Sequence, residues 1–141
     1  MERDDVSSRC NAIEECYEFL LAYAGQGLSG KENSQSISQA RDFLNRAVDA
    51  ITGLAEELAG TVKQENLQPA ERYFAFQSVL DRDARDSLAT IQLVLAQTTI
   101  SSQLIDNLNA SIHLRALLTD LFLIDEILKP QPLTAKPVIT S

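Results

Sequence analysis

The chain has 141 residues, of which 45% are apolar, and its 12 Lys and Arg against 20 Asp and Glu give a formal net charge of -8. This length and composition fit one globular domain and exclude a wholly disordered chain. The acidic balance argues against nucleic acid and anionic membranes as partners, because both are bound by clustered basic side chains.

The first predicted helix covers residues 5–25. Its apolar side chains alternate at spacings of three and four residues, which is typical of an amphipathic helix, and they are Val6, Cys10, Ile13, Tyr17, Leu20 and Ala24. A cluster of glycines beginning at Gly25 predicts its end. Cys10 and Cys16 leave such a helix on different faces, so we expect no disulfide between them.

Two further helices are predicted over residues 37–62 and 69–98. Ser36 and Gln39 form a capping box before the first of these, and Pro69 opens the second, where a missing N–H does no harm. Gly53 lies inside the predicted helix over residues 37–62. Either another helix approaches closely there, or the helix simply tolerates the glycine. In the helix over 37–62 the stripe expected to be buried comprises Ile37, Ala40, Leu44, Ala47, Ile51, Leu54 and Leu58. In the helix over 69–98 it comprises Tyr73, Phe76, Gln77, Leu80, Ala84, Leu88, Ile91 and Leu95.

The fourth predicted helix, over residues 102–129, is apolar on two sides. One stripe faces the core, and it comprises Ala110, Leu114, Leu117, Leu121, Ile124 and Leu128. If the helix is continuous, a second set lies nearly opposite and comprises Ile105, Leu108, Ile112 and Leu123. Such a helix is either buried by its own neighbours or covered by a partner, most simply a second copy of the chain.

These four helices and their short links predict an all-α fold, an antiparallel up-down-up-down four-helix bundle with long helices over residues 1–129. Residues 130–141 contain three prolines and no helical period, so we expect a flexible tail that is extended or disordered. The longest apolar stretches fall short of a membrane span, and no secretory signal is evident, so a cytoplasmic protein is expected.

His113 is the only histidine, and therefore the obvious candidate for a general base or a phosphoacceptor. A bundle that presents one His from a long helix is similar to histidine phosphotransfer domains, and this implies phosphate transfer through His113. The motif of that family follows the His closely with a Lys and a Gly, whereas here Arg115 takes the place of the Lys and no Gly follows. The nearby carboxylates of Asp106 and Asp120 would repel phosphate.

The residues needed for a metal site or a nucleotide-binding loop are missing from the sequence. One His and no Glu-x-x-His argue against a di-iron site, and the glycines after the first helix follow no strand, so no metal, cofactor or catalytic residue is predicted. Asp125 and Asn107 fall within the core stripe of the fourth helix. A carboxylate among leucines needs a partner or access to solvent, or its pKa rises.

The sequence therefore predicts a non-enzymatic bundle that acts through protein–protein interaction, as an adaptor, a chaperone-like factor or a regulator. We expect a homodimer whose candidate interface on the fourth helix comprises Ile105, Leu108, Ile112 and Leu123. A further protein partner, of unknown identity, is expected as well. The alternative is a histidine phosphotransfer domain that uses His113, and phosphate on that residue distinguishes the two.

Overall fold

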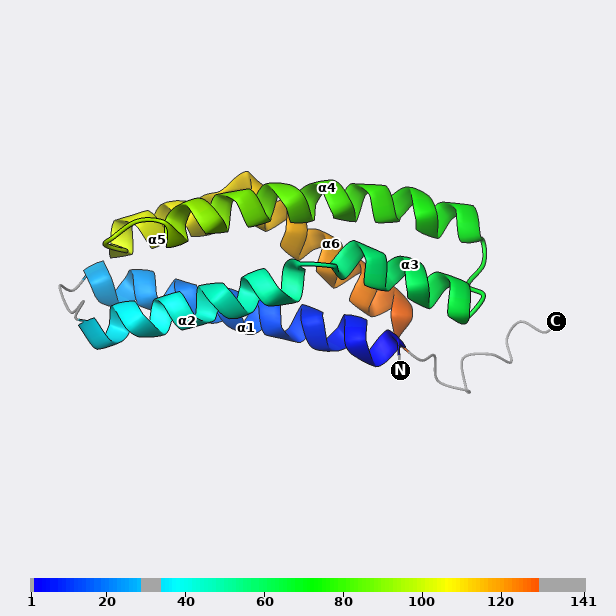
Figure 1. Cartoon of the computed structure of the whole chain (residues 1–141), viewed down its shortest axis with the longest axis horizontal. Helices are drawn as coiled ribbons and strands as arrows, with labels where there is room; N and C mark the ends of the chain where they lie inside the picture. The colour runs from blue at the N-terminus through cyan, green and yellow to red at the C-terminus, as the bar shows by residue number, and fades with distance from the viewer. Residues whose placement is uncertain (1, 29–33, 130–141) are drawn as a thin grey trace.

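A computed structural model describes residues 2–28 and 34–129, and within these ranges the chain is helical apart from short connections, with no strand (Figure 1). The all-α prediction is confirmed. The helices are α1 (Glu2–Leu28), α2 (Ser34–Ile51), α3 (Leu54–Gln64), α4 (Ala70–Leu95), α5 (Ser102–Ala110) and α6 (Ile112–Leu128). The predicted tail at 130–141 lies outside the described residues.

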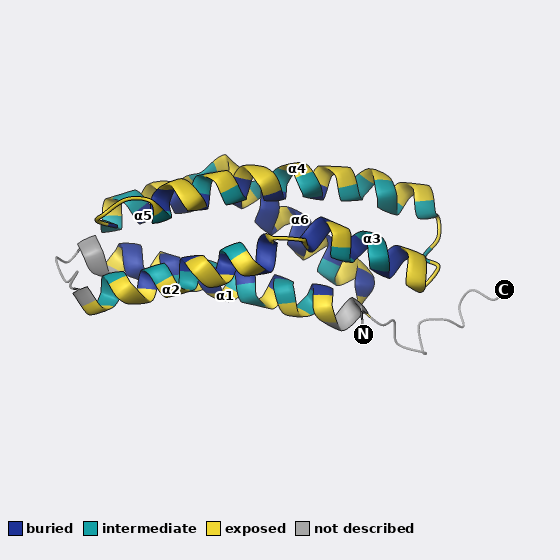
Figure 2. Ribbon diagram, in the orientation of Figure 1, coloured by how far each residue is buried: buried dark blue, intermediate teal, exposed yellow. Residues whose placement is uncertain are grey.

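Figure 1 shows α2 and α3 returning along α1, after which α4 runs back and α5 and α6 return again. Both α1 and α4 pack against α2, α3, α5 and α6. Figure 2 shows that the buried positions lie mainly on the sides of the ribbons that face the neighbouring helices, and the exposed positions on the outer sides. The largest fully buried side chains are Ile13, Leu20, Leu44, Ile51, Leu54, Leu58, Leu80, Ile91, Ile100, Ile105, Leu117 and Leu121.

The ends of two helices differ from the prediction. Helix α1 continues through Gly25 and Gly27 to Leu28, because each glycine costs a helix only about 1 kcal/mol and packing nearby offsets this cost. Tyr23 in this last stretch is buried and donates a hydrogen bond from its hydroxyl to the Ile100 carbonyl at 2.7 Å. Helix α2 begins at Ser34, before the predicted cap.

The predicted continuous helix over residues 37–62 is wrong, because the chain breaks at Gly53. Gly53 has φ +83°, a left-handed conformation that side chains with a Cβ disfavour. The Arg9 guanidinium, from α1, donates to the carbonyls of Ala50 at 3.1 Å and of Thr52 at 2.6 Å. Carbonyl groups at the end of α2 are thus satisfied by a side chain from a neighbouring helix.

We expect Gly53→Ala to lower the free energy of unfolding by about 1–2 kcal/mol, since alanine is strained at this φ. The reason is backbone strain, because an added Cβ would approach only the Arg9 nitrogens, at 3.9 Å. Gly60→Ala is the matched control: it lies within α3, and its Cβ would meet nothing within 4 Å. That change is expected to stabilise the fold by about 0.5–1 kcal/mol. Urea unfolding of both variants checks the prediction, and destabilisation of equal size would contradict it.

A second break, at Ser111, divides the predicted helix over 102–129 into α5 and α6, so the prediction of one continuous helix is wrong there too. Ser111 has an extended backbone with φ -60° and ψ 133°, and its Oγ accepts hydrogen bonds from the backbone N–H groups of His113 at 3.1 Å and Leu114 at 3.4 Å. Ser87, buried in α4, donates from its Oγ to the His113 carbonyl at 3.0 Å. These bonds cap the start of α6 and attach it to α4.

Candidate functional site

The break at Ser111 separates the four candidate interface residues into two pairs. Ile105 and Leu108, in α5, are buried at 0% and 3% exposure, so the prediction that they face a partner is wrong. The helical wheel assumed one continuous helix, and the break changes the direction of every α5 side chain relative to α6. Ile112 and Leu123, in α6, are 73% and 51% exposed and remain open to contact.

The same break overturns two predictions of inward-facing residues. Ala110 and Asn107 are exposed, although the continuous wheel placed both in the core stripe. Asn109 is buried instead, and among the described residues none hydrogen-bonds its side-chain oxygen or nitrogen. An unsatisfied buried amide costs about 1–3 kcal/mol, and nothing in the structure explains why it is kept.

An apolar groove lies between the first turns of α4 and the last turns of α6. Its volume is about 330 Å³, and its lining comprises Pro69, Arg72, Tyr73, Phe76, Leu123, Ile124 and Ile127. Apolar concavities with few polar groups are typical of binding sites on proteins. The groove is therefore a candidate binding site.

Helical spacing explains how both walls of the groove form. Tyr73 and Phe76 are three residues apart on α4, and Leu123 and Ile127 are four apart on α6, so each pair projects from one face of its helix. The sequence placed the two aromatic residues in a buried stripe, but both are half-buried. The α6 segment opposite them leaves part of each ring uncovered, which no single-helix pattern could predict.

Exposed apolar side chains also lie elsewhere on α6, outside the groove. Phe122, Leu123 and Ile127 are all more than half exposed, and Ile112 is exposed farther along the same helix. Single exposed apolar residues are normal, but several on one helix beside an apolar groove indicate a contact surface. We call the surface formed by the groove and these four residues the α4–α6 face.

A pair of carboxyl groups, Asp83 in α4 and Asp120 in α6, lies between these two helices. Asp120 is only 7% exposed, and no described residue forms a hydrogen bond with its Oδ2. Burial, then a side-chain hydrogen bond with Asp83 and the negative charge of Asp83, raise the pKa of Asp120 to about 7. The sequence indicates Asp120 only as a neighbour of His113, although around α6 Asp120 lies about 40° from the core residue Ile124.

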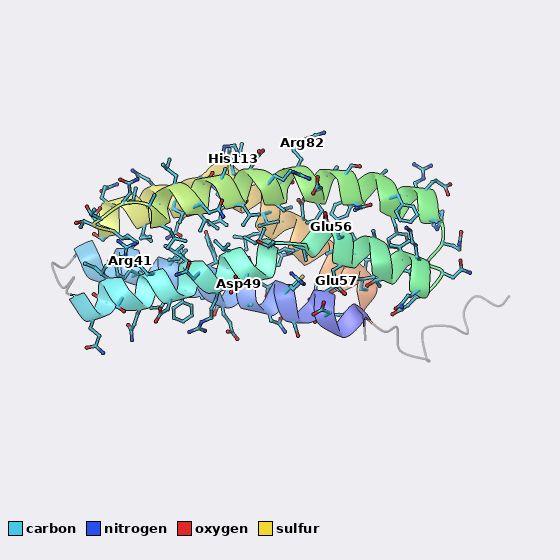
Figure 3. All side chains as sticks on the ribbon, viewed as in Figure 1. Arg41, Asp49, Glu56, Glu57, Arg82 and His113 are labelled. Carbon is cyan, nitrogen blue, oxygen red and sulfur yellow. The ribbon has the colours of Figure 1, made fainter. Side chains whose placement is uncertain are left out.

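His113 lies at the start of α6, beside α4, as Figure 3 shows. Its side chain is half exposed, and its Nδ1 is 3.9 Å from Asp86 Oδ2. The imidazole is accessible to a reagent in solution. A carboxylate beside it opposes the approach of a phosphoryl group, however.

Asp125 is half-buried rather than enclosed in the core, and its charge acts on α1. Burial, with the negative charges of Asp125 and Glu14, raises the pKa of Cys10 to about 12. Burial also raises the pKa of Cys16 to about 12, against the opposing charge of Arg46. Both cysteines are free and buried, and at neutral pH their thiols stay protonated and unreactive.

Within residues 2–28 and 34–129, no cluster of three or more His, Cys, Asp or Glu side chains could hold a metal ion. In the same ranges no helix combines the length and the apolar character needed to cross a bilayer. Comparison with protein-family models, with curated proteins and with solved structures gave no match.

Proposed function

We propose that this chain is a non-enzymatic protein-binding module, an adaptor, chaperone-like factor or regulator, that acts through the α4–α6 face. The observation that supports this most directly is the apolar groove between α4 and α6, flanked by exposed Leu123 and Ile127. When such a surface is buried against a partner, apolar area is removed from water. Each Å² of apolar area buried contributes about 25 cal/mol to the free energy of association. Cys10 and Cys16, both free, fit the reducing cytoplasm, where we place the protein in this proposal.

The proposal includes an up-down-up-down bundle of four columns. We treat α2 with α3 as one column and α5 with α6 as another, with α1 and α4 as the remaining two. Each broken helix keeps its direction after the break in Figure 1, which supports this arrangement. In such a bundle each helix keeps one face away from the core, and on α6 that face carries the exposed Ile112 and Leu123.

The simplest partner is a second copy of the chain, in a two-fold homodimer. Residues 1–70 hold 12 acidic and 6 basic side chains, whereas 71–141 hold 8 and 6. Two copies that meet through α4 and α6 therefore bring together the less charged halves of the sequence, and electrostatic repulsion between them is smaller. A different protein that recognises the same face remains part of the proposal.

We expect Leu123→Glu to convert the dimer to a monomer, because a buried carboxylate in an apolar contact is strongly unfavourable. Leu93→Glu is the matched control: Leu93 is 65% exposed on α4 but does not line the groove. Size-exclusion chromatography with light scattering, over a concentration series, should give about twice the 15.5 kDa chain mass for the unchanged protein and the control. A monomeric unchanged protein, or equal masses for the two variants, would contradict self-association through this face.

A second candidate function, phosphotransfer through His113, is favoured by one observation, the half-exposed imidazole. Asp86 Oδ2, 3.9 Å from the ring nitrogen, weighs against it. Incubation with a phosphorylated receiver domain, followed by mass spectrometry, distinguishes the two functions. Phosphate on His113 that is lost in His113→Gln would support phosphotransfer.

A further inference from the structure

The groove between α4 and α6 has the chemistry of a site for a proline-rich segment. Tyr73 and Phe76 form one wall, and Leu123 and Ile127 form much of the other. Proline-rich segments in the polyproline II conformation bind grooves lined by aromatic side chains, and they lose little conformational freedom on binding because proline already restricts the backbone. An occupant of this kind needs no sheet edge and can place uncharged side chains against the apolar walls.

The chain carries such a segment immediately after α6. Residues 130–141 include Pro130, Pro132 and Pro137, two of them close to Leu133, with one lysine and no acidic residue. Its proline and leucine content matches the apolar, aromatic lining of the groove.

The position where α6 ends favours binding within the same chain. Ile127, which lines the groove, precedes Pro130 by three residues, and Lys129 leaves the helix with φ -61° and ψ 142°, close to polyproline II values. Twelve extended residues reach up to about 40 Å, whereas Leu123 and Ile127 are only about 6 Å apart along α6. A tethered segment is also present at high effective concentration.

We propose that residues 130–141 occupy the groove between α4 and α6 of their own chain, with Leu133 and the neighbouring prolines against Tyr73 and Phe76. The consequence rests on the proposed function: a tail bound in the groove competes with a second copy of the chain for the α4–α6 face. At the upper end of a concentration series the second copy displaces the tail by mass action, so the full-length chain still forms the proposed dimer. Whether the tail binds can be tested without measuring self-association, so the two proposals can fail separately.

The test is disulfide trapping in the full-length chain with Arg72→Cys and Thr134→Cys. Arg72 lines the groove and is exposed, and Thr134 is next to Leu133, so the expected anchor stays in place. Cys10 and Cys16 are buried and do not interfere, since the pKa of each is raised to about 12. Under mild oxidation we expect an intramolecular disulfide, seen as a faster-migrating monomer on a non-reducing gel and by intact-mass spectrometry.

The control pairs Thr134→Cys with Lys63→Cys. Lys63 is exposed in the last turn of α3, at the same end of the molecule as the start of α4 (Figure 1), but does not line the groove. We expect the Arg72 pair to form its disulfide about tenfold faster than the control pair. Equal rates, or disulfides mainly between chains, would overturn the proposal.

A second variant separates binding from simple tethering. Adding Leu133→Ser to the Arg72→Cys and Thr134→Cys chain removes the apolar anchor but leaves the tether length unchanged. We expect the rate to fall to that of the Lys63 control. An unchanged rate would show that the tail is held near Arg72 by its tether alone, and would overturn the proposal.

Discussion

Replacing Ile105 by Ala is expected to lower the free energy of unfolding by about 2–4 kcal/mol, because the side chain is completely buried and its removal leaves a cavity. The same type of change at Ile112, which is 73% exposed, is expected to alter it by no more than about 0.5 kcal/mol. Both residues belong to one surface if the helix is continuous. The contrast therefore tests the break at Ser111 directly.

Urea unfolding followed by far-UV circular dichroism measures both effects, and the two variants serve as controls for each other. Each replacement removes the same atoms from an isoleucine and introduces the same helix-favouring residue. If both changes were neutral, or both equally destabilising, the separation of α5 from α6 would be contradicted. Both replacements are made in the Leu123→Glu chain, which is expected to be monomeric, because Ile112 lies on the α4–α6 face and would add to stability in a dimer.

The second large effect is a pH-dependent loss of stability caused by Asp120. Its ordinary pKa of 3.8 is raised to about 7 by burial and by the hydrogen bond and negative charge of Asp83. Below the ordinary value the carboxyl is protonated in both the folded and the unfolded state. As pH rises from 3.8 to about 7 the unfolded chain loses this proton more readily, so the free energy of unfolding falls, and above about 7 the loss is complete.

We therefore expect Asp120→Asn to raise the free energy of unfolding by about 1–3 kcal/mol near pH 8 and to change it little near pH 4. An amide keeps the shape of the carboxyl group, carries no charge and can donate a hydrogen bond to Asp83. Urea unfolding at a series of pH values measures the effect. Asp106→Asn, on an exposed residue of α5, controls for the loss of one negative charge from an acidic chain. If the two variants had the same pH profile, the buried carboxyl pair would not be the cause.

Apolar periodicity predicted well those residues that face inward from an unbroken helix. In α1, Val6, Cys10, Ile13 and Leu20 are buried as expected, and in α6 the stripe from Leu114 to Leu128 is buried. These predictions succeed because the direction of a side chain depends only on its position along a regular helix. They required no knowledge of the neighbouring helices.

The two breaks could not be predicted in the same way. Gly53 was visible in the sequence, but a glycine inside a helix costs only about 1 kcal/mol and is often tolerated. Its left-handed conformation occurs where the Arg9 guanidinium binds carbonyls at the end of α2. Ser111 has an N-cap residue type, but its capping role follows from the hydrogen bonds that hold the first turn of α6.

The candidate site was also predicted only in part from the sequence. The sequence identified α6 as a helix with two apolar sides and named Ile112 and Leu123, which are exposed. It did not predict the groove, because the groove needs Tyr73 and Phe76 from a helix about fifty residues earlier in the sequence. Nor did it single out Asp120, whose burial depends on how closely α4 packs against α6.

The sequence by itself determined that this chain is helical and acidic. It also showed that the segment which forms α6 has apolar residues on more than one side. These properties follow from residue types and from spacings of three and four residues, which are local. The tertiary structure decided where the helices break, which apolar residues stay exposed and which carboxyl group is buried. Each of these depends on atoms that are far apart in the sequence and meet only when α1 packs on α2 and α4 packs on α6.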